Sequence, residues 1–301
     1  MRKIPFHVFV LEKLHRSLGR CFKSVNKLKK KYLSRYFAEI YAPIIKKYEN
    51  LNTPEVLDDP IPKIIWVLWW QGDYRENRLV NCCINRMRQL DFDLRVVSKD
   101  NIEEYVDISD VRQYYEKGLL KTSALADIIR LRLLIAYGGI WLDASVFVVD
   151  ESFLDSVTSY GCFYSGHFSK YPSWKNISGG MWTTYFLASC SQNPLLKFCD
   201  EALVYCLKLH GRQIDYIMFD YTIACGYASI PFFKTMIDRI PYNNDGVWAL
   251  KGKLNKRFDQ NVWVNIERTV QLLKFSVAND KAEDMPYKTF FDKMREIAEI
   301  N

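Results

Sequence analysis

The clearest pattern of apolar and polar positions lies between Thr122 and Ser145. Apolar side chains recur there three or four positions apart, at Ala124, Ile128, Leu131 and Ile135. This spacing predicts an amphipathic helix, which Gly138-Gly139 stops because glycine adopts helix-terminating conformations at little cost. The apolar run after the glycines, residues 140–142, predicts a short strand that ends at Asp143.

Strand and helix patterns also alternate through much of the remaining chain. Apolar runs predict strands at residues 63–70, 94–98, 162–166 and 177–182, and helical spacing predicts helices at residues 77–90 and 194–207. A strand, helix, strand, helix order predicts an α/β fold with a mostly parallel sheet. The last third of the chain is polar and is predicted to be loop-like. Three prolines in residues 53–62 predict a linker, so we expect an N-terminal extension over residues 1–60 and a main domain over residues 61–301.

Two charged residues, Asp127 and Arg130, interrupt the apolar helix. They lie three positions apart and therefore share one face. One interpretation is an exposed salt bridge on a core helix. The other is a buried polar site, because the helix is too apolar to face water and buried charges need partners. Asp143 favours the second, since ligand sites in open α/β sheets lie where strands end.

The charge of the chain is unevenly distributed. Residues 1–50 contain 13 Lys and Arg against 3 Asp and Glu, a net charge of +10, whereas the other 251 residues contain 29 against 32, a net charge of −3. The basic segment is predicted to form one or two amphipathic helices. They could pack on the main domain or bind an anionic membrane surface. Nucleic acid is not an expected partner, because no groove-reading or base-stacking motif accompanies the charge.

The eight cysteines show no metal-binding spacing, and most lie in apolar surroundings. Buried free thiols in a reducing compartment are therefore expected. No segment has the length and apolarity of a membrane span, and the N-terminal apolar run is too short for a signal peptide. We expect a cytoplasmic location, with possible attachment to the inner face of the plasma membrane.

The segment from Ala124 to Ser145, A-x-x-D-x-x-R-x-x-L-L-x-x-Y-G-G-I-W-L-D-A-S, resembles the donor-sugar segment of glycosyltransferase family 32. It is most similar to bacterial capsular polysaccharide synthesis glycosyltransferases, and large glucosylating toxins share its arrangement. The resemblance covers about residues 61–240. It implies the nucleotide-binding α/β fold called GT-A and transfer of a hexose from a nucleotide diphosphate sugar, with UDP as the expected nucleotide and retention of anomeric configuration.

The resemblance also implies roles for individual residues. Asp127 and Arg130 are expected to bind hydroxyls of the donor sugar and, with Asp143, to form the catalytic site. Asp143 corresponds to the first carboxylate of a D-x-D motif that holds Mn²⁺ or Mg²⁺ on the diphosphate. Ser145 stands where the motif has its second aspartate, and its hydroxyl is a weaker, uncharged metal ligand.

Two tryptophans and two further carboxylates are additional candidates. The family begins its domain with a motif similar to I-W-x-x-W-x-Q-G, which residues 65–72 match. This resemblance favours Trp66 or Trp69 as a platform for uracil; the alternative is a core position. Asp215 and Asp220 lie five residues apart, so at most one of them is expected to enter the site.

The sequence thus predicts a metal-assisted hexosyltransferase. Its expected partners are a nucleotide sugar donor, a saccharide or lipid-linked oligosaccharide acceptor, and an anionic membrane surface bound by residues 1–50. The alternative is a non-catalytic, membrane-associated carbohydrate-binding or scaffold protein with a degenerate metal site, because Ser145 replaces a carboxylate.

Overall fold

The computed structural model describes residues 23–51, 54–171, 177–277 and 285–299. Its main sheet has five strands in the order β2-β1-β3-β6-β5. β1 is parallel to β2 and to β3, whereas β6 is antiparallel to both of its neighbours, so four of the five strands run in one direction. The predicted α/β fold with a mostly parallel sheet is confirmed. The strand bounds are β1 Ile64–Leu68, β2 Asp93–Val97, β3 Gly139–Leu142, β5 Phe163–Ser165 and β6 Phe186–Ser189.

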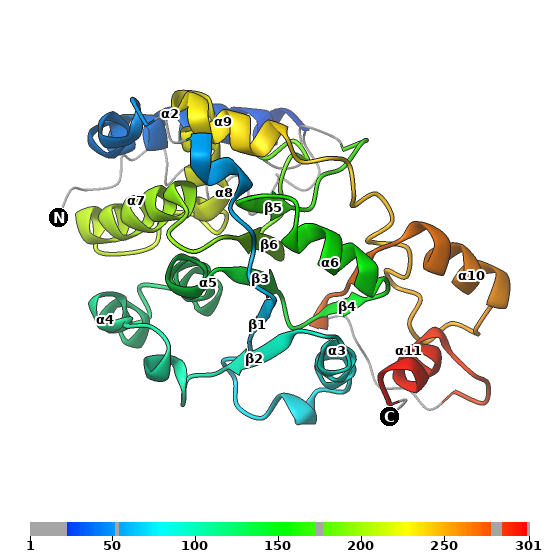
Figure 1. Ribbon diagram of the computed structural model, residues 1–301. Coiled ribbons are helices and arrows are strands. Elements are labelled where there is room, and N and C mark those ends of the chain that lie inside the picture. The colour runs from blue at the N-terminus through cyan, green and yellow to red at the C-terminus, as the bar shows by residue number, and fades with distance from the viewer. Residues whose placement is uncertain (1–22, 52–53, 172–176, 278–284, 300–301) are drawn as a thin grey trace.

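Helices cover both faces of this sheet. Figure 1 shows α5 (Thr122–Tyr137) on one face, and α3 (Arg78–Arg88) and α6 (Glu151–Thr158) on the other. Because both faces are covered, β3 is buried along its whole length. The remaining helices of this part are α4 Ser109–Glu116, α7 Pro194–His210, α8 Met218–Ser229 and α9 Pro231–Asp238.

The predicted central helix and strand are α5 and β3. Ala124, Ile128 and Leu131 of the apolar stripe are buried. Gly138 has a φ of 67° and Gly139 a φ of 102°, a region that favours glycine. A Cβ atom on Gly139 would lie 2.7 Å from the carbonyl oxygen of Ile64 in β1, so only glycine lets β3 begin this close to its neighbour.

The N-terminal helix α2 (Lys23–Tyr48) packs on α7 and α8. Its apolar face is buried in the same core as the sheet, through Leu33, Tyr36, Phe37, Ile40, Tyr41 and Ile44. Lys29 and Asp215 form a buried ion pair with a distance of 2.6 Å. Of the apolar residues in the predicted stripe over residues 25–40, Tyr36 and Ile40 pack on the domain, whereas Leu28 and Tyr32 are exposed. Residues 1–22 of the basic segment lie outside the described part.

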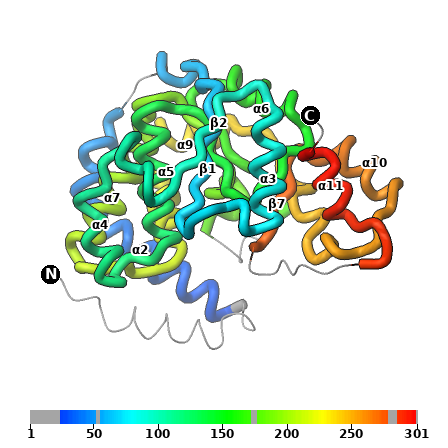
Figure 2. The backbone as a smooth tube through the Cα atoms, turned by 90° about the horizontal axis from the view of Figure 1, so that it is seen from below, coloured from blue at the N-terminus to red at the C-terminus, as the bar shows by residue number. Residues whose placement is uncertain are grey.

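The C-terminal third differs from the predicted loop. It contains α10 (Gln260–Thr269), β7 (Leu272–Lys274) and α11 (Phe290–Glu299). β7 pairs with β4 (Val146–Val148) in a second, two-stranded antiparallel sheet, and α11 packs beside α3 (Figure 2). The helices were missed although α11 buries an apolar face.

Another predicted strand, over residues 177–182, was wrong. Gly179 and Gly180 have φ values of 60° and 97° and form a turn, and the strand β6 begins only at Phe186. The seven cysteines within the described residues are free and buried, as expected. Every helix that the structure describes is too short or too polar to cross a bilayer.

Candidate functional site

The predicted site residues Asp127, Arg130 and Asp143 meet where β3 ends. β1 and β3 are adjacent parallel strands whose register pairs Trp66 with Trp141. Trp69 and Asp143 therefore follow the carboxyl ends of neighbouring strands, the edge at which open α/β sheets bind ligands. α5 runs beside the same strands and contributes Asp127 and Arg130.

Arg130 joins the two acidic residues. Its Nη1 atom lies 2.8 Å from Oδ1 of Asp127, and its Nη2 atom lies 3.4 Å from Oδ1 of Asp143. The side chain is only 5% exposed, and its guanidinium lies 4.7 Å from the ring centroid of Trp141. The buried Nε atom has no hydrogen-bond partner in the described structure. Asp127 and Arg130 therefore form a buried polar cluster with Asp143, and not an exposed salt bridge.

Asp143 accepts hydrogen bonds from several donors. Its Oδ1 atom accepts from the indole Nε1 of Trp141 at 3.0 Å, and its Oδ2 atom lies 3.0 Å from Nζ of Lys274. Burial by itself would raise the pKa of Asp143, but the charges of Lys274 and Arg130 and the Trp141 hydrogen bond outweigh it and lower the pKa. Asp143 is therefore a stable carboxylate at neutral pH.

The other two carboxyl groups of the cluster are shifted in the opposite direction. Burial raises the pKa of Asp127 to about 7, and the charges of Asp220 and Asp143 add to this despite the opposing effect of Arg130. Burial also raises the pKa of Asp220 to about 6, and Nε1 of Trp182 donates a hydrogen bond to it. Three carboxyl groups with such divergent pKa values are typical of functional sites.

Of the two acidic candidates in the 214–221 segment, Asp220 lies near Asp127 and Arg130. Asp215 instead pairs with Lys29 and accepts a hydrogen bond from the backbone N–H of Ile217. This arrangement agrees with the expectation that at most one of the two enters the site.

Lys274 is the site residue that sequence reasoning missed. Its Nζ atom lies 3.0 Å from Oδ2 of Asp143 and donates to Oγ of Ser145 at 2.6 Å. Ser145 in turn donates its hydroxyl hydrogen to the carbonyl oxygen of Phe275. The two predicted metal ligands are therefore bound to one ammonium group.

These residues do not fit a divalent cation in this arrangement. An ion between Asp143 and Ser145 would displace the Lys274 ammonium and would also meet the positive charge of Arg130 on the other oxygen of Asp143. Mg²⁺ prefers about six oxygen ligands. Within the described ranges, no group of three or more His, Cys, Asp or Glu side chains is placed to hold a metal ion.

The two candidate tryptophans have different environments. Trp66 is fully buried; its Nε1 atom donates to the carbonyl oxygen of Gly138, and the guanidinium of Arg95 lies 5.1 Å from its ring. No face of Trp66 is open to a base, which corrects its assignment as a platform. Trp69 is partly exposed and remains the candidate.

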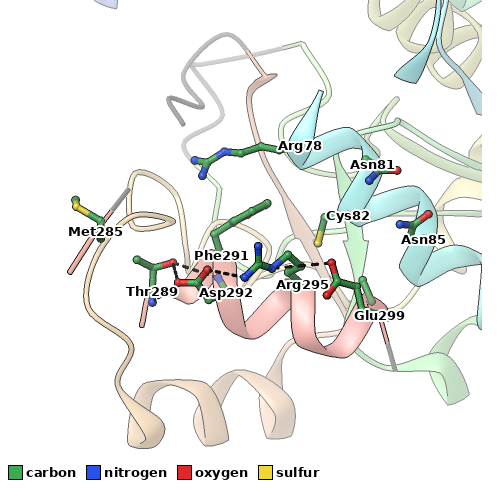
Figure 3. Close-up of a pocket in the computed structure, with 11 residues that line it drawn as sticks. Arg78, Asn81, Cys82, Asn85, Met285, Thr289, Phe291, Asp292, Arg295 and Glu299 are labelled. Carbon is green, nitrogen blue, oxygen red and sulfur yellow. Dashed lines mark hydrogen bonds and ion pairs between the residues drawn. The ribbon is translucent and has the colours of Figure 1, made fainter. Parts of the chain in front are cut away.

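A separate cavity of about 420 Å³ lies between α3 and α11 (Figure 3). Figure 3 shows Arg78 and Asn81 on one wall and Asp292, Arg295 and Glu299 on the other. Arg295 pairs with both acidic residues, so these charges compensate one another. Asp127, Arg130 and Asp143 do not line this cavity.

Comparisons of sequence and of structure with known proteins indicate the family of the chain. No curated protein matches it in sequence. It is similar to a solved structure described as the PaToxG glycosyltransferase, with 15% identity and a TM-score of 0.42 over 70% of this chain and 83% of that chain. Such a TM-score is too low to establish a common fold. A family model described as capsular polysaccharide synthesis protein matches residues 17–294, which include α2 and the whole site, and the chain belongs to this family.

Proposed function

We propose that this protein is a glycosyltransferase of the GT-A type that moves a hexose from a nucleotide diphosphate sugar, with UDP-hexose as the expected donor. The acceptor is a saccharide or lipid-linked oligosaccharide in the synthesis of capsule or another surface polysaccharide. The observation that carries the proposal is the buried Arg130 held between Asp127 and Asp143 at the carboxyl end of β3. Membership of the capsular polysaccharide synthesis family supports the pathway.

Asp127 and Arg130 have the chemistry to bind the sugar. A carboxylate accepts hydrogen bonds from hydroxyl groups, and a guanidinium donates them in a fixed planar geometry. The Asp127 side chain is 18% exposed, whereas the side chain of Arg130 is almost fully buried. In the proposed complex, Asp127 orients the donor hydroxyls and Arg130 fixes Asp127.

Trp69 is the proposed platform for the base. It follows β1 at the same sheet edge as Asp143, and an indole ring stacks well on a flat base. The sugar and the base would then lie at the ends of two adjacent strands.

The proposed reaction retains the anomeric configuration. The acceptor oxygen bonds to the anomeric carbon from the face that the diphosphate leaves, while the bond between that carbon and the diphosphate oxygen breaks. The departing diphosphate takes the hydroxyl proton, so no protein base is required. Proton NMR of the first product formed distinguishes retention from inversion, because the two outcomes give different anomers.

The prediction that Mn²⁺ or Mg²⁺ assists transfer stays a prediction. No step of the proposed mechanism uses it, since Lys274 holds both Asp143 and Ser145.

A panel of nucleotide sugars tests the donor. The full chain should slowly hydrolyse one of them, and the corresponding free nucleotide should bind and quench tryptophan fluorescence. Asp127→Asn should weaken binding of the nucleotide sugar at least tenfold and leave binding of the free nucleotide nearly unchanged, because Asp127 faces the sugar. Asp100→Asn, at an exposed turn residue, is the matched control.

The rival function is a carbohydrate-binding or scaffold protein without catalysis. Its specific support is the engagement of both predicted metal ligands by Lys274. Tight binding of a nucleotide sugar without hydrolysis or transfer, in the presence of a saccharide acceptor, would favour this function over the enzyme.

A further inference from the structure

Lys274 is the last residue of β7, and the backbone fixes its place beside the site. β7 pairs antiparallel with β4 so that Lys274 lies opposite Val146, the residue that follows Ser145. The backbone N–H of Phe275 also donates to the carbonyl oxygen of Ser145. The segment Asp143-Ala144-Ser145 is thereby held against the end of β7, and the Lys274 side chain is only 14% exposed.

The hydrogen bonds of the ammonium group leave one donor for a ligand. An ammonium group has three N–H donors. One points to Oδ2 of Asp143 and another to Oγ of Ser145. An ammonium group can only donate, so Oγ of Ser145 accepts from Lys274 and donates its own hydrogen to the carbonyl oxygen of Phe275.

The charge of Lys274 lies where a bound cation would lie. It contacts both side chains that the D-x-S segment offers to an ion, and Arg130 contacts the other oxygen of Asp143. Two basic side chains therefore flank one carboxylate in a mostly buried site. The aromatic ring of Tyr185, whose centroid is 5.8 Å from Nζ, further favours a cation there.

We propose that the ammonium of Lys274 takes the place of a divalent cation and binds the diphosphate of the donor. This inference rests on the proposed function, since it assumes a nucleotide diphosphate sugar at the site. The third N–H of Lys274 donates to a diphosphate oxygen, while Asp143 and Ser145 hold the ammonium in position. As the diphosphate leaves with its developing negative charge, the fixed ammonium stabilises it without a metal ion.

The proposal differs measurably from metal assistance. A protein side chain cannot be removed by a chelator, so binding of the diphosphate should not depend on EDTA or added Mn²⁺. Removal of a charged hydrogen-bond donor from a mostly buried site should weaken diphosphate binding about ten- to a hundredfold.

The test is a titration of the full chain with UDP, followed by tryptophan fluorescence, with EDTA and with Mn²⁺. The variants are Lys274→Met, which removes the charge at similar length, and Lys274→Arg, which keeps it. Lys251→Met is the matched control, because Lys251 is an exposed lysine whose Nζ lies 5.4 Å from the Trp248 ring. The melting temperature of each variant is measured alongside.

The expected result has three parts. Wild-type protein and the Lys251→Met variant each bind UDP with the same affinity in EDTA as in Mn²⁺. Lys274→Met loses at least tenfold in affinity in EDTA, and Lys274→Arg recovers part of this loss. If Lys274→Met does not fold, Lys274→Gln replaces it, because glutamine removes the charge but keeps a hydrogen-bond donor for Asp143 and Ser145.

Two results would overturn the inference and leave the proposed function intact. One is UDP binding by the wild type that EDTA abolishes and Mn²⁺ restores. The other is unchanged UDP affinity in a folded Lys274→Met variant. If the wild type binds no nucleotide of the panel under either condition, the proposed function fails and the inference fails with it.

Discussion

Oδ2 of Asp143 lies 3.0 Å from Nζ of Lys274, although the two residues come from opposite halves of the chain. Asp143 follows β3 of the main sheet, and Lys274 ends β7 of the small sheet. The ion pair therefore connects the two sheets at the site. It makes the C-terminal segment a structural part of the site, although the family resemblance that was visible in the sequence ended near residue 240.

Removal of the Asp143 charge should destabilise the protein. In Asp143→Asn, Lys274 loses its carboxylate and Arg130 keeps only Asp127, so a buried positive charge loses its partner. We expect the free energy of unfolding to fall by about 3 kcal/mol, as measured by urea denaturation. Ser145→Ala, which removes one neutral acceptor of the same ammonium, should cost only about 1 kcal/mol. Equal stability of Asp143→Asn and wild type would contradict the role given to this pair.

The sequence allowed the centre of the site to be predicted because its signals are local. The spacing of Asp127 and Arg130 on one helix, the glycine stop and the following strand all lie within one continuous segment. Local patterns of this kind determine both the elements and the relative positions of their side chains. The structure accordingly brings Asp127, Arg130 and Asp143 together.

Lys274 could not be predicted in the same way. β7 is three residues long and pairs with β4 across more than a hundred positions of sequence. Neither strand has enough residues for a clear alternating pattern, and nothing local specifies the partner of so short a strand. α11 is a different case, because Phe290, Met294 and Ala298 recur at helical spacing and all three are buried.

Trp66 in β1 and Trp69, which follows β1, should respond differently to substitution. The sequence does not show which of the two tryptophans is buried, because a strand of a parallel sheet covered on both faces has no alternation of apolar and polar residues. Trp66→Phe removes a buried hydrogen bond to Gly138 and core volume, so it should lower the free energy of unfolding by roughly 1–3 kcal/mol. Trp69→Phe should leave stability nearly unchanged and weaken UDP binding several-fold. Fluorescence titration and urea denaturation measure the two effects, and a reversed pattern would reject Trp69 as the base platform.

Asp127 should make stability depend on pH. Its pKa in the folded protein is raised to about 7, whereas an aspartate in an unfolded chain titrates near about 3.9. The folded state thus binds the proton more tightly. The resulting stabilisation is fully present below about pH 4 and is lost as the pH rises through about 7.

Asp127→Asn isolates this effect, because asparagine resembles the protonated acid at every pH. The free energy of unfolding of the variant minus that of the wild type should increase by a few kcal/mol between about pH 4 and pH 8, measured by urea denaturation at several pH values. A difference that stays constant over this range would show that Asp127 is ionised throughout.

The buried pair of Lys29 and Asp215 should anchor α2. Lys29→Met leaves the Asp215 carboxylate buried with only the backbone N–H of Ile217, at a cost of about 3 kcal/mol. A chain that starts near Asn52 should be unstable or insoluble, since it exposes the surface of α7 and α8 that α2 covers. A stable, soluble truncated protein would show that α2 is dispensable for the core.

For the described part of the N-terminal segment, the predicted attachment to anionic membranes depends on the outer face of α2. The face of α2 that contains Tyr36 and Ile40 is buried, but Lys27, Lys31 and Arg35 are exposed and lie four residues apart, so they share one outer face. Leu28 and Tyr32 are exposed beside them. About 1 kcal/mol is available for each basic residue near an acidic lipid surface.

The full chain should therefore sediment with vesicles containing phosphatidylserine at low salt and be released as salt shortens the Debye length. Reversal of the three charges to Glu should reduce this binding without lowering the melting temperature, because all three side chains face away from the core. Charge reversal that leaves vesicle binding intact would exclude this face as the membrane contact.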